Sequence, residues 1–265
     1  MKVSRAFLLL CLIFSGCNTV NNGLIIHSNF EPGENESEES PCWALHGAVL
    51  SDDSIVGHGS IYFDGVDDYV EYPKDRIYFD GDYSISVWVK WKDCKMWNRI
   101  MDFNQDAPMS GNAVTWLIGR PAQGSENSLW FDQWVTYEGN AVESIVDQMT
   151  SPGEAYLGYD VKLDRWDHYV IVYDSSVDNP LGVVRNKKGL NVPYEGKVTF
   201  YLNGEKMGES YRCLKPQPIS TSCNWLGRSR FAPDPFFNGW MDDFRIYDRK
   251  LSKKEINALY DLRNK

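Results

Sequence analysis

Short alternating segments recur along this chain of 265 residues, and they restrict its fold more than any other feature. Each segment is rich in β-branched and aromatic residues, repeats with a period of two and ends near turn-forming residues, as strands do. The clearest examples are residues 83–91 and 166–173. Many short strands joined by polar turns indicate a sandwich or barrel built from β-sheets.

The other segments with this pattern predict further strands. Residues 60–72 fit a hairpin that bends at Asp64 and Gly65, and Asn203-Gly204 is a dipeptide favoured in tight hairpin turns. Two long connections, 139–163 and 175–197, interrupt the pattern, and loops of this length often carry function. The remaining predicted strands span residues 24–30, 96–103, 113–119, 128–137, 198–202, 225–227 and 240–247.

Helical periodicity is convincing only at the C-terminus. Ser252 fits the N-cap of a short helix, and Glu255 three residues later completes a capping box. No internal repeat or change of composition divides the chain, so residues 24–265 are predicted to form one domain. A hydrophobic content of 43% is enough for one sizeable core. We therefore expect an all-β fold with one short C-terminal helix.

The charge of the chain argues against one class of partner. The formal net charge is −10, and the sequence shows no basic stretch that would supply phosphate contacts. We therefore expect no binding to nucleic acid.

The first residues resemble a processing signal. A basic start precedes an apolar run over residues 6–14, which is shorter than the roughly 20 residues that span a membrane. Small residues then lead to Cys17, as in the lipobox of bacterial lipoproteins. By that resemblance, residues 1–16 form a signal peptide, Cys17 carries lipid and residues 17–23 form a tether. The prediction is an exported lipoprotein of the bacterial cell envelope, in the outer membrane; ordinary signal cleavage near Gly16 is the alternative.

Four further cysteines could form disulfide bonds, which an exported compartment permits. Four cysteines allow three pairings. Cys213 and Cys223 flank one short loop, which favours a bond between them and leaves Cys42 to pair with Cys94 by elimination. A zinc site is the weaker interpretation, because the C-x-x-C spacing and a nearby histidine pair are both missing.

The segment 240–247 places an acid among aromatic residues. In a regular strand Asp242 shares a face with Trp240, Phe244 and Ile246. A buried carboxylate needs hydrogen-bond donors, a cation or contact with water. Asp242 is therefore either a cation ligand or an acceptor of backbone N–H bonds.

Several blocks of the sequence resemble LamG-like jelly-roll domains of the concanavalin A-like lectin/glucanase superfamily. Residues 57–70 contain its F-D-G-x-D-D-Y-V opening, and residues 238–260 its closing D-D-x-R-I-Y strand and E-I-x-x-L-Y helix. Further blocks in family order are residues 83–90, 166–170, 200–204 and 226–228. By this resemblance, the fold is a jelly-roll sandwich of two antiparallel sheets packed face to face.

The resemblance also implies a structural calcium near the closing strand and the first strand. Asp242 matches the family's acid, and calcium takes six to eight oxygen ligands. Glu34 and Asn35, in the loop after the first expected strand, are the candidates for further ligands. The alternative is that Asp242 accepts backbone N–H bonds and binds no ion.

The expected strand over residues 128–137 supplies the predicted binding surface. Its alternate residues put two aromatic rings, an acid and a hydroxyl on one face; they are Trp130, Asp132, Trp134 and Thr136. Flat rings suit the C–H face of a sugar, while polar groups suit its hydroxyls. Trp116 and Arg120 are expected to border the same surface. The alternative is that the tryptophans belong to the core between the sheets.

No catalytic motif accompanies this surface. Retaining glycosidases need two carboxylates about 5–5.5 Å apart, and the E-x-D-x-x-E run of glucanase relatives is missing, as are H-E-x-x-H and G-x-S-x-G. We predict non-catalytic recognition of a glycan by a lipid-anchored exported protein. The alternatives are a protein-binding or adhesion lipoprotein and, third, a glycan hydrolase or lyase whose carboxylates come from distant strands.

Overall fold

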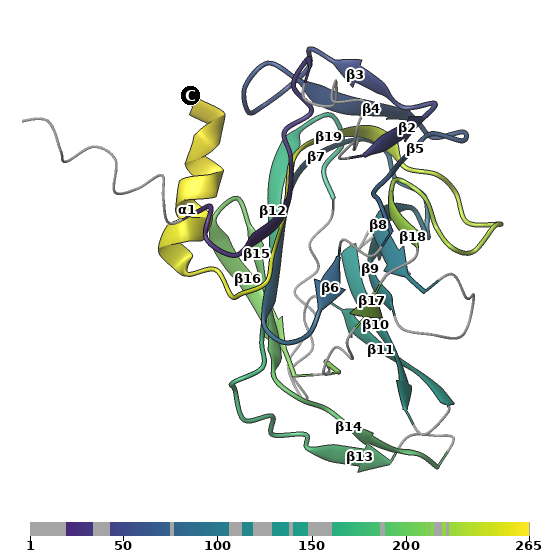
Figure 1. The fold of residues 1–265 in the computed structure, drawn as a ribbon, viewed down its shortest axis with the longest axis vertical. Coiled ribbons are helices and arrows are strands. Elements are labelled where there is room, and N and C mark those ends of the chain that lie inside the picture. Colours follow the sequence, from purple (N-terminus) through teal and green to yellow (C-terminus); the bar gives the residue numbers. More distant parts are fainter. Residues whose placement is uncertain are drawn as a thin grey trace, which may run out of the picture.

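Two large antiparallel sheets face each other in the computed structural model (Figure 1), which confirms the predicted jelly-roll sandwich. The structure describes residues 20–33, 43–74, 77–105, 113–118, 129–137, 140–147, 161–185, 189–211, 213–214, 219–220 and 223–264. In those ranges no helix is long and apolar enough to cross a membrane.

The first sheet is built around β7, and β1 pairs with β19 beside this path. Its strand order is β16 (Glu205–Ser210), β15 (Lys197–Leu202), β12 (Trp166–Asp174), β7 (Tyr83–Asp93), β19 (Asn238–Tyr247), β4 (Ser60–Asp64) and β3 (Val49–Ser51), with β1 at Leu24–Ser28. The turn at Asn203-Gly204 joins β15 to β16 with φ angles of 51° and 81°. Positive φ at both positions is what a tight hairpin turn requires, so the predicted hairpin is confirmed.

The second sheet carries the strands from the middle of the chain. Its order is β11 (Asn140–Asp147), β10 (Leu129–Tyr137), β9 (Ala113–Ile118), β8 (Arg99–Asn104), β18 (Cys223–Leu226), β5 (Tyr69–Glu71) and β2 (Ala44–His46). Two small sheets pair β13 (Val183–Arg185) with β14 (Asn191–Pro193) and β6 (Tyr78–Phe79) with β17 (Ile219–Ser220).

Period-two alternation builds the core between the sheets. Alternate residues of β7, from Tyr83 to Trp91, are buried in the main hydrophobic cluster, and Leu129 and Phe131 of β10 join it from the opposite sheet. Because successive side chains of a strand point to opposite faces, the residues between them point away from this core.

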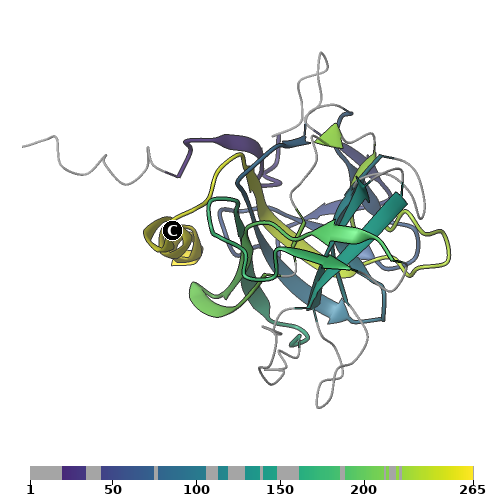
Figure 2. The same ribbon diagram turned by 90° about the horizontal axis from the view of Figure 1, so that it is seen from below.

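A short helix covers the outer side of the first sheet. α1 (Lys253–Tyr260), followed by the 3-10 turn η1 (Asp261–Asn264), lies on the side turned away from the second sheet (Figure 1, Figure 2). The predicted capping box is confirmed, because the Ser252 hydroxyl accepts from the backbone N–H of Glu255 and the Glu255 carboxylate accepts from that of Ser252 at 2.8 Å.

The predicted hairpin over residues 60–72 is wrong. β4 pairs with β3 and β19 in the first sheet, whereas β5 pairs with β18 and β2 in the second. Phe63 and Val70 are both buried in the common core, so the turn at Gly65 carries the chain from one sheet to the other. The two predicted long connections are also interrupted, by β11 in the first and by β13 and β14 in the second.

The predicted alternation of β19 fails at a β-bulge. Its pairing with β7 shifts between Asp242 and Arg245, and Asp243 has a φ of 46°. The inserted residue brings both Met241 and Phe244 to the core side. Asp242 therefore does not share a face with Phe244 and lies on the outer side of the first sheet.

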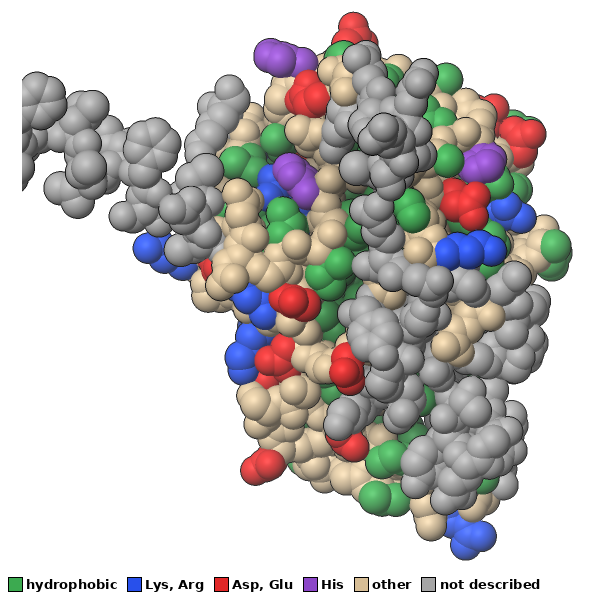
Figure 3. Space-filling model, in the orientation of Figure 1, with side chains coloured by type: hydrophobic (Ala, Val, Ile, Leu, Met, Phe, Trp, Pro, Cys, Tyr) green, Lys and Arg blue, Asp and Glu red, His purple; other side chains and the backbone are tan. Residues whose placement is uncertain are grey.

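Charges of both signs are interspersed on the described part of the face drawn in Figure 3. On that face, acidic, basic and apolar side chains alternate rather than gather by type. On this face, therefore, gross charge does not mark a binding surface.

Candidate functional site

Polar and aromatic side chains form a row across the second sheet. The pairing aligns Trp225 of β18 with Asp102 of β8, Asp102 with Thr115 of β9, and Thr115 with Asp132 of β10. The apolar chain neighbours of these residues lie in the core, so the row itself points away from it; they are Met101, Phe103, Val114, Trp116, Phe131 and Leu226. We call this surface, together with Trp130 and Trp134, the outer face of the second sheet.

The predicted group on β10 lies on this face. Trp130 is half-buried, and its ring lies nearly perpendicular to that of Trp97 at a centroid distance of 6.2 Å. Trp134 is only 7% exposed and Asp132 8%. The indole N–H of Trp134 donates to Asp132 Oδ2 at 2.7 Å. Trp130 therefore offers ring surface to a ligand, while Trp134 and Asp132 form a fixed support beside it.

The prediction for Trp116 is wrong. This side chain is 1% exposed and belongs to the core between the sheets. Trp116 pairs with Phe131, not with Trp130, and this register puts it on the core face. Arg120 and the side chain of Thr136 lie outside the described residues, so their place at the site stays a prediction.

A buried ionic network supports the outer face of the second sheet. Asp102 Oδ2 accepts the backbone N–H of Arg230 at 3.0 Å, and its Oδ1 accepts from Asn104 at 3.1 Å and Thr115 at 3.3 Å. Arg99 donates to Asp234 at 2.9 Å and lies 3.7 Å from Asp102. Burial lowers the pKa of Arg99, and the neighbouring carboxylates oppose this shift. Asp102 is therefore occupied in holding the loop after β18 against the sheet.

Two arginines of that loop stack on aromatic rings of the same face. The Arg228 guanidinium lies 4.3 Å from the ring centroid of Trp225 and 4.6 Å from that of Tyr69. The Arg230 guanidinium lies 4.9 Å from Trp134. The contacts with Tyr69 and Trp134 could not be predicted from the sequence, because these rings come from strands far away along the chain.

Asp242, the predicted cation ligand, lies under the loop before β4. Its Oδ2 accepts the backbone N–H groups of Ile55 and Val56, each at 2.9 Å, and its Oδ1 is buried without a partner. Burial raises the pKa of Asp242 to about 7, although the two hydrogen bonds act to lower it. This is the backbone-acceptor arrangement expected as the alternative. Glu34 and Asn35 lie outside the described residues, and calcium stays a prediction.

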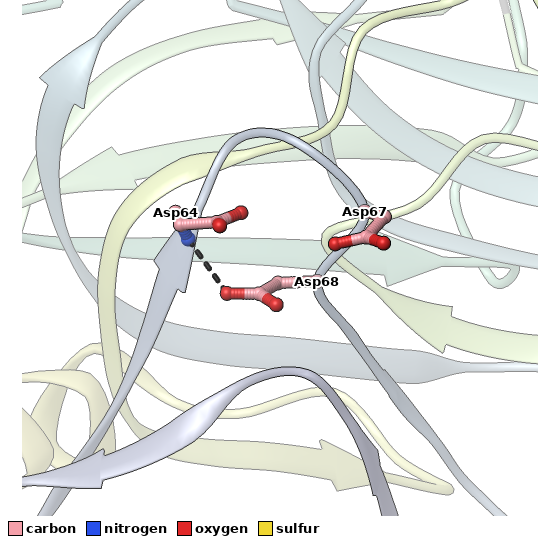
Figure 4. A group of neighbouring side chains, drawn as sticks. All are labelled: Asp64, Asp67 and Asp68. Atoms are coloured by element: carbon pink, nitrogen blue, oxygen red, sulfur yellow. Dashed lines mark hydrogen bonds between the residues drawn. The ribbon is translucent and has the colours of Figure 1, made fainter.

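Three carboxylates gather at the turn between β4 and β5. Asp64, Asp67 and Asp68 have possible ligand atoms within 4.8 Å of one another (Figure 4). Burial raises the pKa of Asp68, whose Oδ2 accepts the backbone N–H of Asp64 at 2.8 Å. Asp64 Oδ1 in turn accepts from Val66 at 2.8 Å. The three carboxylates offer the oxygen ligands that hard cations prefer. Their described hydrogen bonds stabilise the turn itself.

No disulfide bond joins the cysteines of the described residues. Cys94, Cys213 and Cys223 are all free cysteines, and Cys42 lies outside the described residues. The Cys213 thiol donates to the carbonyl of Glu195 at 3.2 Å. Burial raises the pKa of Cys213 and of Cys94 to about 12 in both cases, so neither thiol is activated.

A family model described as the concanavalin A-like lectin/glucanases superfamily matches residues 63–257. The chain belongs to this superfamily. The match runs from β4 into α1 and includes strands of both large sheets, which confirms the resemblance seen in the sequence.

Solved structures share the fold at low identity. Domain 4 of AbnA, an extracellular arabinanase from Geobacillus stearothermophilus, in complex with arabinotriose, matches with a TM-score of 0.59 and 16% identity over 89% of this chain and 98% of that domain. The receptor binding domain of botulinum neurotoxin type G matches at 0.52 and 12%, over 91% of this chain and 51% of its own. The serotype D ligand binding domain, in complex with N-acetylneuraminic acid, matches at 0.52 and 14%, over 93% and 52%. The chain thus spans about half the length of these toxin domains.

Proposed function

We propose that the protein recognises a glycan, without cleaving it, on the outer face of the second sheet. The observation that carries the proposal is the half-buried ring of Trp130 beside the hydrogen-bonded Trp134–Asp132 pair. A rigid indole held at a sheet surface suits the C–H face of a sugar ring, and polar neighbours suit its hydroxyls. Relatives of the fold bound to arabinotriose and to N-acetylneuraminic acid support this class of ligand.

The carboxylates of the row support binding rather than hydrolysis. A retaining glycosidase needs two carboxylates about 5–5.5 Å apart that are free to act as nucleophile and acid. Asp102 is fully buried and accepts three hydrogen bonds. Asp132 holds the indole of Trp134. A catalytic role for this pair would require breaking the contacts that keep the face in shape.

A glycan array tests the proposed function. The soluble chain from residue 18 onward retains every described residue, including Val20, which packs in the cluster under α1. We expect binding to a restricted set of glycans, with no shortening of the bound glycans detected by mass spectrometry. A folded protein that binds nothing on the array would refute the proposal, and cleaved products would replace it with the hydrolase or lyase alternative.

We also propose that the protein is exported and anchored in the cell envelope, in the outer membrane, through lipid on Cys17. The basic start, the apolar run over residues 6–14 and the small residues before Cys17 support this. Metabolic labelling with a fatty acid should mark the wild-type protein and leave Cys17→Ala unlabelled. Equal labelling of both proteins would contradict the anchor.

A protein-binding role is the second candidate, and exposed apolar residues on two edge strands favour it. Leu45 of β2 is 38% exposed, and Val49 and Leu50 of β3 are 52% and 43% exposed. Edge strands with apolar side chains can pair with another chain. This role would gain support if the array were empty and Leu50→Lys reduced attachment of cells that carry the protein.

A further inference from the structure

Arg228 and Arg230 differ from the other arginines in the described part of the chain. Most of those arginines face a carboxylate: Arg99 with Asp102 and Asp234, Arg165 with Asp167, Arg245 with Asp243, Arg249 with Glu255, and Arg263 with Asp261. Arg185 instead bonds the carbonyl of Gly189. For Arg228 and Arg230, the described contacts of the guanidinium groups are with aromatic rings.

The unmet bonding capacity is largest at Arg230. The residue is only 8% exposed, and its Nε and Nη1 are buried without a hydrogen-bond partner. Its guanidinium lies between the rings of Trp134 and Phe231, at 4.9 and 5.1 Å. Ring faces attract a cation but do not satisfy its N–H groups. A buried cation without an acceptor is costly, so this arrangement is incomplete by itself.

Arg228 presents the same chemistry nearer the solvent. Its guanidinium is half-buried and stacks on Trp225 and Tyr69. Trp225 is the neighbour of Asp102 in the row, and Asp102 holds the backbone of Arg230. Both arginines therefore lie on the outer face of the second sheet, Arg228 over β5 and β18 and Arg230 over β10.

Three acids around this face are engaged in other contacts. Asp102 accepts three hydrogen bonds, as described above, and Asp132 holds the Trp134 indole. Asp234 accepts from Arg99 at 2.9 Å and from Ser229 at 2.7 Å. Glu71 of β5, which pairs with Trp225, contacts His46 at 3.1 Å. The surface thus carries two guanidinium groups whose described contacts include no carboxylate, although the whole chain is acidic at −10.

We propose that the glycan bound on this face is anionic, and that carboxylate or sulfate groups along it are received by Arg228 and by Arg230. This inference rests on the proposed function and names the ligand class of the same site. A guanidinium offers a planar fork of N–H donors that matches such oxyanions, and the stacked rings hold the fork in place. Trp130, on the same face, then contacts an adjoining sugar ring.

Titration calorimetry on the chain from residue 18 onward tests the proposal with three probes: oligogalacturonate for a carboxylate, chondroitin sulfate oligosaccharides for sulfate, and arabinotriose as a neutral sugar. We expect at least one acidic probe to bind tenfold or more tightly than arabinotriose, and to weaken as salt is raised. The acidic probe that binds distinguishes carboxylate from sulfate. Equal binding of neutral and acidic probes would overturn the inference and leave glycan recognition standing.

Three variants assign the effect to these residues. Arg228→Gln and Arg230→Gln should each weaken the acidic probe about tenfold or more, which corresponds to about 1.4 kcal/mol, and change arabinotriose binding less than about twofold. Arg185→Gln removes an exposed arginine of β13 and should change neither. Circular dichroism checks that each variant is folded. If Arg230→Gln unfolds, Arg228→Gln still tests the inference, because Arg228 is only half-buried. Wild-type affinity of a folded Arg228→Gln for the acidic probe would refute the inference, whereas no binding of any probe would count against the proposed function itself.

Discussion

Replacing Asp242 tests how the outer side of the first sheet is held together. In Asp242→Ala the backbone N–H groups of Ile55 and Val56 lose their acceptor, to which each now donates at 2.9 Å. Both residues are half-buried, so water compensates part of the loss, and two bonds to a carboxylate amount to about 2 kcal/mol. For a domain of this size that corresponds to about 4–8 °C in Tm. Asp242→Asn keeps an acceptor oxygen and should lose less than about 1 kcal/mol.

The pH dependence of the same pair separates hydrogen bonding from metal binding. Burial raises the pKa of Asp242 from 3.8 to about 7 in the folded protein. The folded state therefore holds this proton more tightly than the unfolded state, and the stability from the group is full below about pH 4 and lost as the pH rises to about 7. The Tm of the wild type relative to Asp242→Asn should rise when the pH falls from 8 to 5, by differential scanning fluorimetry.

A bound calcium predicts the opposite sign. A metal-ligating carboxylate must be ionised, so acid would displace the ion and destabilise the wild type relative to Asp242→Asn. A relative Tm that falls with pH, together with a lower wild-type Tm in chelator, would refute the backbone-acceptor account of Asp242 and support the calcium prediction.

Three further predictions follow from buried contacts. Asp102→Ala removes the acceptor of the Arg230 backbone N–H and should lower the free energy of unfolding by about 2–4 kcal/mol in a urea titration; an unchanged midpoint would contradict the anchoring role. Ser252→Ala removes the N-cap of α1 and should cost about 1 kcal/mol in the same assay, with an unchanged value counting against the cap. Because Cys213 and Cys223 are free cysteines in the structure, a reducing agent should leave the Tm unchanged and alkylation of the unfolded chain should modify both. A Tm that drops on reduction would instead support the predicted disulfide.

Local signals in the sequence predicted those parts of the fold that depend on neighbouring residues. The turn at Asn203-Gly204 and the capping box of Ser252 and Glu255 need only a few adjacent side chains, and both are confirmed. The alternation of β7 also needed only its own residues, because every second side chain meets the core.

The failures arise where pairing between distant strands decides the outcome. Asp243 adopts a positive φ in a bulge, and one inserted residue moves Asp242 to the other side of the sheet. Trp116 lies in the core because it pairs with Phe131 of the neighbouring strand. The residues of its own strand do not reveal this register.

The candidate site was partly predictable for the same reason. Trp130, Asp132 and Trp134 lie on one strand, so alternation placed them on one face. Arg228 and Arg230 contact the rings of Tyr69 on β5 and Trp134 on β10, and only the folded sheet brings these distant residues together.

Glycan titrations of Trp130→Ala test the central claim most directly. The matched control is Trp240→Ala. Trp240 is also half-buried but lies on the first sheet, where its indole N–H donates a hydrogen bond to the Ser51 hydroxyl. With the tightest glycan from the array, loss of the Trp130 ring should weaken binding about tenfold or more, and Trp240→Ala should bind as the wild type does. Wild-type affinity in a folded Trp130→Ala protein would contradict glycan recognition on the outer face of the second sheet.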